Sequence, residues 1–152
     1  MRLLLMRHGQ AEPAHMGTDR DHLRALTEFG AQEVMDRACS LKSIMDQPII
    51  VHSPFLRAQQ TAELLHVHTG WIISHAWTAL QPESDPVGLE SWCRDQQHDL
   101  VLVAHMPLLG LLCARLLDEP GQNYPLVTAG VHELHMLEPQ GSGVFRLLRT
   151  YG

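Results

Sequence analysis

The residues near the start of the chain that are best suited to chemistry are an arginine and a histidine in the tetrapeptide Met-Arg-His-Gly, residues 6–9. An arginine side chain presents a planar set of donors that can bind two phosphate oxygens at once. A histidine can act as a nucleophile, a base or a metal ligand. Arg7 and His8 directly follow the apolar run at residues 3–5, which predicts a strand that delivers both side chains to the edge of a sheet.

Two further apolar runs end in the same way. Residues 49–52 predict a buried strand, and the next segment predicts a helix with Ser53 as its N-cap and Arg57 in its first turn. Residues 100–104 form the most strand-like run of the chain, and His105 follows it before a proline opens another helix. Three strands therefore each end close to an arginine or a histidine.

Strands that end in this way predict a common site, because ligands of open α/β sheets bind at the carboxyl ends of the strands. We expect catalytic residues Arg7, His8, Arg57 and His105 to lie together and to bind a phosphate group. The arginines would hold phosphoryl oxygens, and His8 would attack phosphorus through a neutral ring nitrogen. His105 would be protonated and would stabilise negative charge on the transferred group.

These segments resemble the histidine phosphatase superfamily, which has a phosphoglycerate-mutase-like fold, and in particular its short SixA-type phosphohistidine phosphatases. The similarity covers most of the chain, and Ser-Pro-Phe-Leu-Arg-Ala at residues 53–58 is its most specific marker. Two residues depart from the family pattern, since Ala25 replaces a usual proline and Ala104 replaces a usual serine. The other matching segments are residues 5–9, 24–27 with Gly30, Gln60 with Thr61, and residues 103–108.

The resemblance implies a covalent phosphohistidine at His8 that water later hydrolyses, and a third cationic contact to substrate from Arg24. A solvated loop arginine is the alternative interpretation of Arg24. Larger members of the superfamily use a carboxylate to protonate the leaving group, and the candidates in this chain are Glu83 and Asp85. We expect Glu83 to contact substrate, with an exposed loop carboxylate as the alternative. A phosphoramidate substrate needs no such acid, because imidazole is a much weaker base than an alkoxide.

The hydrophobic pattern predicts an α/β fold, a three-layer α/β/α sandwich whose mostly parallel sheet contains an antiparallel strand. Residues 1–152 should form a single histidine phosphatase domain, with a short loop at residues 138–143 that joins the last two strands as a hairpin. We expect helices at residues 27–44, 55–65, 89–97 and 107–117, and further strands at residues 72–73, 131–137 and 144–148.

Composition restricts the classes of function. Hydrophobic residues make up 45% of the 152 residues and charged residues 18%, as in a globular protein. No apolar run approaches the ~20 residues of a membrane span, and the first residues do not form a signal peptide, so we expect a cytoplasmic monomer that binds no membrane. Cys39, Cys93 and Cys113 fit reduced thiols. The net charge of −6 argues against a nucleic-acid partner.

Two pairs of histidines allow a metal-site interpretation: His66 with His68, and His132 with His135. Catalytic zinc needs three converging ligands, whereas residues 132 and 135 of a strand point to opposite faces. We therefore expect ordinary surface or core histidines, no metal and no cofactor.

Three functions remain open. The first is a phosphohistidine phosphatase that acts on a phosphorylated protein, such as a histidine-containing phosphotransfer domain, because the chain has few residues between positions 65 and 83 for a lid over the site. The second is a phosphomonoesterase that acts on a small metabolite, phosphoserine or phosphothreonine. The third is a catalytically inactive module that binds phosphoproteins, which would have no need of a nucleophile.

Overall fold

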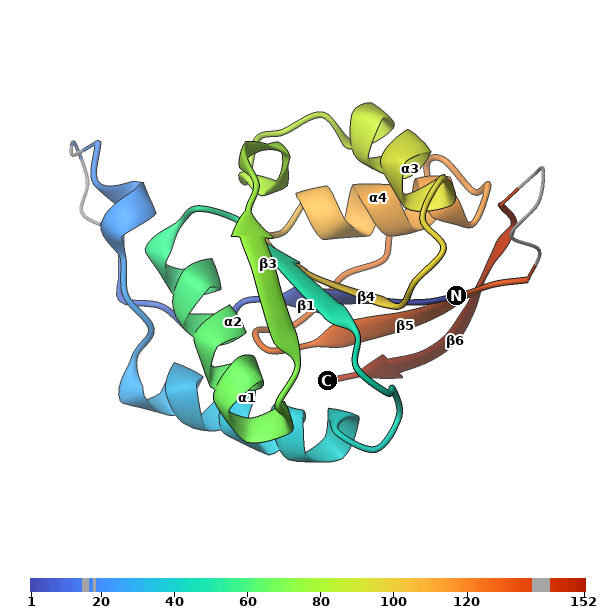
Figure 1. The fold of residues 1–152 in the computed structure, drawn as a ribbon. Helices are drawn as coiled ribbons and strands as arrows, with labels where there is room; N and C mark the ends of the chain where they lie inside the picture. Colours follow the sequence, from blue (N-terminus) through green and yellow to red (C-terminus); the bar gives the residue numbers. More distant parts are fainter. Residues whose placement is uncertain (15–16, 18, 138–142) are drawn as a thin grey trace.

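The computed structural model describes residues 1–14, 17, 19–137 and 143–152, and its centre is a six-stranded sheet (Figure 1). The order across the sheet is β3-β2-β4-β1-β5-β6. The strands are β1 (Arg2–Arg7), β2 (Ile49–His52), β3 (Ile72–Ala76), β4 (Leu100–Ala104), β5 (Val131–Met136) and β6 (Phe145–Tyr151).

The predicted mostly parallel sheet is confirmed. β1 pairs in parallel with β4, which pairs in parallel with β2, and β2 pairs in parallel with β3. β5 runs antiparallel to both of its neighbours, β1 and β6. The hairpin loop predicted between β5 and β6 falls mostly on residues 138–142, which lie outside the described residues.

Helices cover both faces of the sheet, as the predicted three-layer sandwich requires. In Figure 1, α1 (Glu28–Leu41) and α2 (Leu56–Thr69) lie on one face, and α3 (Pro86–Arg94) and α4 (Leu108–Leu116) lie on the other. Successive side chains of a strand point to opposite faces. In β1, Leu3 and Leu5 therefore enter the core beneath α3 and α4, whereas Leu4 and Met6 enter the core beneath α1 and α2.

Local capping explains where some helices depart from their predicted ends. The helix predicted at 89–97 is α3, which begins earlier because Asp85 accepts a hydrogen bond from the Val87 amide and Pro86 suits the first helical turn. Thr27 caps α1 rather than lying in it, and α1 ends at Leu41, short of the predicted residue 44. Two short 3₁₀ helices, Asp21–Leu23 and Thr78–Leu80, complete the described structure.

The prediction that Ser53 is a helix N-cap is wrong. Phe55 occupies the N-cap position of α2, whose first residue is Leu56. The Ser53 hydroxyl is oriented toward His105 instead, and it accepts only a long hydrogen bond from the Phe55 amide, 3.3 Å. The first turn of α2 still contains Arg57, as predicted.

Three other elements, α2, β3 and β6, extend further along the chain than predicted. The expected helix at 55–65 continues to Thr69, where Gly70 ends it in a left-handed conformation. The expected strands at 72–73 and 144–148 are β3 and β6, and both continue further along the chain. Within the residues described, no helix has the length and the apolar character needed to cross a membrane.

Two glycines bring the loop after β1 into close contact with α1. A Cβ atom on Gly9 would lie 2.5 Å from the Gly30 carbonyl oxygen, and a Cβ atom on Gly30 would overlap the backbone of Gln10. The loop that follows His8 can therefore reach its position only because neither glycine has a side chain.

We predict that Gly30→Ala destabilises the protein by about 1–3 kcal/mol, because the backbone of Gln10 would have to move away from α1. Urea unfolding would measure the change. Gly88→Ala in α3 is the matched control, since its new methyl group would meet no atom within 4 Å, and the substitution should be neutral or stabilising by up to about 1 kcal/mol. A Gly30→Ala protein as stable as wild type would contradict the close contact.

Candidate active site

Three neighbouring parallel strands end at the candidate site, and backbone hydrogen bonds hold their ends together. The His8 amide, just after β1, donates to the Ala104 carbonyl at the end of β4, 3.1 Å away. The Ser53 amide, just after β2, donates to the Val103 carbonyl, 2.9 Å away. The structure thus brings His8, His105 and the first turn of α2 to one edge of the sheet.

The ring of His8 is fixed in one orientation and one tautomer. Its Nδ1 lies 2.7 Å from the Gly9 carbonyl oxygen, which can only accept, so Nδ1 carries the hydrogen. Its Nε2 accepts a hydrogen bond from Arg57 Nε at 3.2 Å. Nε2 therefore carries no hydrogen, and in this structure its lone pair is directed at Arg57 Nε.

The surroundings of His8 keep its ring neutral. Burial lowers the pKa of His8 to about 4, against a partial increase from the hydrogen bond to Gly9 and with further lowering by the charges of Arg57, Arg7 and Arg24. A neutral imidazole is the form that can act as a nucleophile. The positive charges of all three arginines thus oppose protonation of the His8 ring.

Arg57 is 3% exposed, and each nitrogen of its side chain has a partner. Nη1 donates to the backbone carbonyl of Asp21 at 2.8 Å, and Nη2 lies 3.2 Å from the Asp21 carboxylate. Arg24 meets the same carboxylate through Nε at 2.8 Å. Arg24 therefore lies at the rim of the site rather than as a free loop arginine.

Asp21 is a residue of the site that the sequence did not reveal. Burial alone would raise the pKa of its carboxyl group, but hydrogen bonds and charge from Arg24 and Arg57 outweigh burial and lower that pKa below 3.8. The carboxylate is thus ionised at neutral pH. The only signal for Asp21 in the sequence is its position three residues before Arg24. In the structure Asp21 begins the first 3₁₀ helix, and Arg24 follows that helix.

Arg7 has a buried donor that no described residue uses. Its Nη1 donates to the Leu126 carbonyl at 2.8 Å, whereas its Nε is buried without a hydrogen-bond partner among the described residues. An unpaired buried donor is costly, and such groups are often found where a ligand binds. Burial lowers the pKa of Arg7, but the ordinary pKa of arginine is so high that the side chain keeps its charge.

His105 lies beside His8, with 5.0 Å between the ring centroids. Its Nε2 is 2.8 Å from the Ser53 hydroxyl, and its Nδ1 is buried without a partner among the described residues. Burial, followed by the charges of His8 and Arg57, lowers the pKa of His105 to about 2. The protein groups alone therefore favour a neutral His105, contrary to the expected protonated form, because that expectation included the charge of a phosphate dianion.

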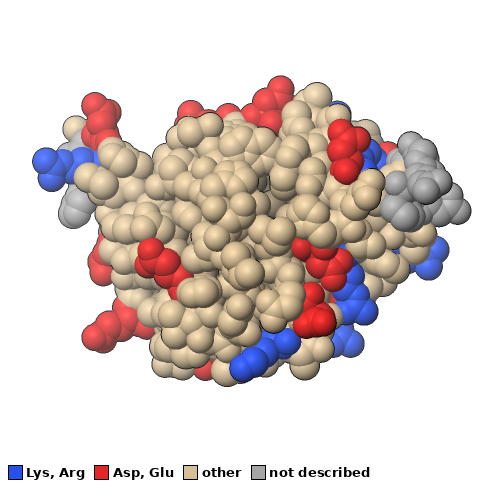
Figure 2. All heavy atoms as spheres, viewed as in Figure 1, with Lys and Arg blue, Asp and Glu red and all other residues tan. Residues whose placement is uncertain are grey.

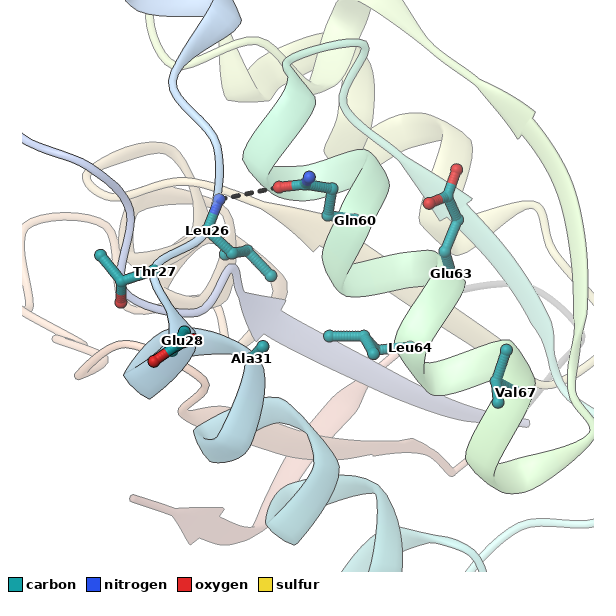
Figure 3. Close-up of a pocket in the computed structure, with 8 residues that line it drawn as sticks. All are labelled: Leu26, Thr27, Glu28, Ala31, Gln60, Glu63, Leu64 and Val67. Carbon is teal, nitrogen blue, oxygen red and sulfur yellow. Dashed lines mark hydrogen bonds between the residues drawn. The ribbon is translucent and has the colours of Figure 1, made fainter.

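The family motif residues after Arg57 position the loops of the site. Thr61 donates to the Arg57 carbonyl at 2.7 Å and accepts from the Gly9 amide at 3.2 Å. Gln60 accepts from the Leu26 amide at 2.7 Å, which ties the loop behind Arg24 to α2 (Figure 3). The groove drawn in that figure, about 500 Å³, lies between α1 and α2 and contains none of the predicted catalytic residues.

The two candidate acids differ in position. Glu83 is exposed and lines a hollow of about 270 Å³ together with Asp21, Phe55, Gln81 and Pro82. Asp85 does not line that hollow, because its carboxylate caps α3. Glu83 therefore lies at the rim of the site, and Asp85 has a structural role.

Two of the four histidines considered as metal ligands have other partners. His66 Nδ1 lies 2.7 Å from the Trp71 carbonyl oxygen, and the two nitrogens of His132 contact Thr150 and the Tyr124 carbonyl. On the face shown in Figure 2, the Lys and Arg side chains lie toward the edges of the face, with Asp and Glu side chains beside several of them. The arginines of the site, by contrast, gather around His8.

Comparison with known proteins gives two kinds of match. The sequence profile of the histidine phosphatase superfamily (branch 1) matches residues 3–81. No curated protein matches the chain. Among solved structures, the protein histidine phosphatase SixA in complex with tungstate has a TM-score of 0.84 at 27% identity, covering 99% of this chain and 96% of that one.

Two other solved structures share the fold at lower identity. A SixA protein from Agrobacterium tumefaciens has a TM-score of 0.77 at 21% identity, with 99% of this chain and 97% of that chain covered. A mycobacterial glucosyl-3-phosphoglycerate phosphatase in complex with VO3 has a TM-score of 0.71 at 22% identity, with 96% of each chain covered. The last two matches concern the fold alone.

We predict that the free energy of unfolding falls as the pH is lowered, because His8 and His105 are neutral in the folded protein. Both have folded-state pKa values, about 4 and about 2, below the ordinary 6.5 of an unfolded chain. Their contribution is fully present above about pH 6.5 and is lost as the pH falls toward those values, by at most about 1.4 kcal/mol per pH unit for each histidine. Urea unfolding at pH 5, 6 and 7 would measure the slope.

The variant His105→Gln provides the control for this prediction. It removes one of the two titrating rings, so its stability should depend less steeply on pH over the same range. An unchanged slope in that variant would show that His105 is not held neutral in the folded protein.

Proposed function

The chain belongs to the histidine phosphatase superfamily (branch 1), and from this premise we propose that it removes phosphate from a histidine-phosphorylated protein. It is a phosphatase with a histidine nucleophile. In the proposal His8 is that nucleophile, Arg7, Arg57 and Arg24 hold the phosphoryl oxygens, and His105 assists. The observation that carries the proposal is the unprotonated Nε2 of His8, fixed by Gly9 and surrounded by arginines.

In the proposed first step, Arg57 Nε turns from Nε2 of His8 to a phosphoryl oxygen, and the freed lone pair of Nε2 attacks phosphorus while the bond to the leaving group breaks. Nδ1 keeps its hydrogen, which it donates to the Gly9 carbonyl oxygen. The phosphorylated ring therefore carries a positive charge next to the phosphoryl dianion. Arginines stabilise the oxygens of the transferred group through charge-assisted hydrogen bonds. The buried Nε of Arg7 is one donor that is ready for this purpose.

Binding of the substrate would raise the pKa of His105, so that its ring becomes protonated. A phosphoryl dianion close to the ring favours the charged imidazolium and opposes the lowering that burial causes. The unpartnered Nδ1 of His105 could then donate to a phosphoryl oxygen. In the second step, water attacks the phosphohistidine and releases inorganic phosphate, which restores a neutral His8.

The acid–base groups of the site favour an imidazole leaving group. Asp21 is held ionised by two arginines, so it is not a carboxylic acid that stays protonated at neutral pH, and Glu83 is exposed at the rim rather than buried. An alkoxide needs such an acid when it leaves, whereas a protonated phosphoimidazole leaves as a neutral ring. These carboxylates therefore suit a phosphohistidine substrate better than a phosphate ester.

The substrate in this proposal is a phosphorylated protein, and the enzyme is a cytoplasmic monomer. The similarity to SixA, a protein histidine phosphatase, supports that class of substrate. The free thiols of Cys39, Cys93 and Cys113 are suited to a reducing compartment. The second candidate function is a phosphatase for a small phosphate ester, because a glucosyl-3-phosphoglycerate phosphatase shares the fold.

We predict that wild-type protein forms a phosphohistidine on His8 when it is mixed with a phosphoryl donor. The adduct should be labile in acid and stable in base, and mass spectrometry should locate it on the peptide that contains His8. His8→Ala should lose the adduct and all turnover but keep its circular dichroism spectrum. Turnover in His8→Ala at the wild-type rate would rule out this nucleophile.

We also predict that the enzyme hydrolyses a phosphohistidine protein much faster than an alkyl phosphate. Glu83→Gln should leave the phosphohistidine reaction within a few-fold of wild type, because neutral imidazole leaves with little help from an acid. Asp85→Asn, which keeps the oxygen that caps α3, is the matched control. A wild-type enzyme that is fast on a sugar phosphate and loses about 10²–10⁴-fold in rate in Glu83→Gln would support the ester phosphatase instead.

A further inference from the structure

The hollow beside the phosphate-binding groups has one aromatic wall. Phe55 is half-buried, and it lines this space of about 270 Å³ with Asp21, Gln81, Pro82 and Glu83. The residues of the wall come from three places in the chain: the first 3₁₀ helix, the start of α2 and the loop before α3.

Phe55 also touches two groups of the candidate active site directly. Its ring centroid lies 5.2 Å from that of His105, with the two planes at 66°. The Arg57 guanidinium carbon lies 5.0 Å from the same centroid. Asp21, which also lines the hollow, forms an ion pair with Arg57 as well. Two residues that line the hollow therefore contact groups that would hold a phosphoryl group.

The charged residues that line the hollow restrict which leaving groups it can bind. Among the residues described, its lining contains two carboxylates, Asp21 and Glu83, and no lysine or arginine. Asp21 is ionised, because Arg24 and Arg57 lower its pKa. A leaving group that carries a carboxylate, such as a phosphoglycerate, would meet negative charge there. A flat ring that is neutral or positive would meet an aromatic face and favourable charge.

We propose that this hollow binds the imidazole ring of the substrate phosphohistidine and that Phe55 is its main specificity contact. The proposal rests on the function proposed above and adds the part of the protein that recognises the leaving group. When Nε2 of His8 bonds to phosphorus, the bond from phosphorus to the substrate ring nitrogen breaks and its electron pair stays on that nitrogen. The other ring nitrogen keeps its proton, so the ring leaves as neutral imidazole against Phe55.

The test compares two small substrates with the same type of bond. Phosphoimidazole has a P–N bond to an aromatic ring, and phosphoramidate has a P–N bond to ammonia with no ring. The readout is the ratio of kcat/KM for phosphoimidazole to kcat/KM for phosphoramidate. Any change that acts only through Arg57 or His105 affects both substrates and leaves this ratio unaltered, so the ratio isolates recognition of the ring.

Phe55→Leu keeps an apolar side chain but removes the aromatic face, and it should lower the ratio by about three- to tenfold. Phe55→Tyr keeps the ring and should restore most of the ratio. Phe29→Leu is the matched control, because Phe29 is a phenylalanine of α1 that is 62% exposed and does not line the hollow. If Phe55→Leu does not fold, Phe55→Met offers a second non-aromatic side chain for the same measurement.

The outcomes separate the two proposals. A wild-type enzyme active on both P–N substrates, with the same ratio in Phe55→Leu as in wild type, would overturn the ring-binding role and leave the proposed function intact. A wild-type enzyme that is inactive on both P–N substrates and on a phosphohistidine protein, but active on alkyl phosphates, would overturn the proposed function itself. A lower ratio in Phe55→Leu that Phe55→Tyr restores would support the inference.

Discussion

The parallel pairing of β4 with β1 on one side and with β2 on the other determines where the two histidines of the site and the start of α2 lie. Because the three strands run in the same direction, their carboxyl ends meet at one edge. The backbone bonds from His8 to Ala104 and from Ser53 to Val103 continue this pairing beyond the strands. His8, His105 and the start of α2 are thus positioned by backbone hydrogen bonds at the ends of neighbouring strands.

Placing histidines among arginines produces the chemistry of the site. Water is largely excluded, so the rings of His8 and His105 remain neutral, while the arginines retain their charge. Asp21 partly balances that charge from the rim. In the proposed function, a substrate phosphate brings the additional negative charge that this cluster of cations can accommodate, and its binding would be coupled to protonation of His105.

The sequence was sufficient where a motif joins a strand end to a functional side chain. The positions of His8, Arg57 and His105 follow from three apolar runs and the residues after them, and the structure places them together. Asp21 and Phe55 could not be found in this way. Asp21 lies in a 3₁₀ helix without a hydrophobic pattern, and Phe55 reads as an ordinary apolar residue at a helix start. The orientation of Ser53 was also missed, because its contact with His105 competes with capping.

The alternating burial of β1 has a consequence for the dynamics of the site. Leu3 and Leu5 belong to one core and Leu4 and Met6 to the other, so neither helical layer can separate from the sheet without exposing part of this strand. Local opening is easiest where few buried contacts are lost. Opening of β1 would break buried contacts on both faces of the sheet. Its amide hydrogens should exchange with solvent only through global unfolding. His8, which directly follows this strand, is thereby attached to the slowest-exchanging part of the protein.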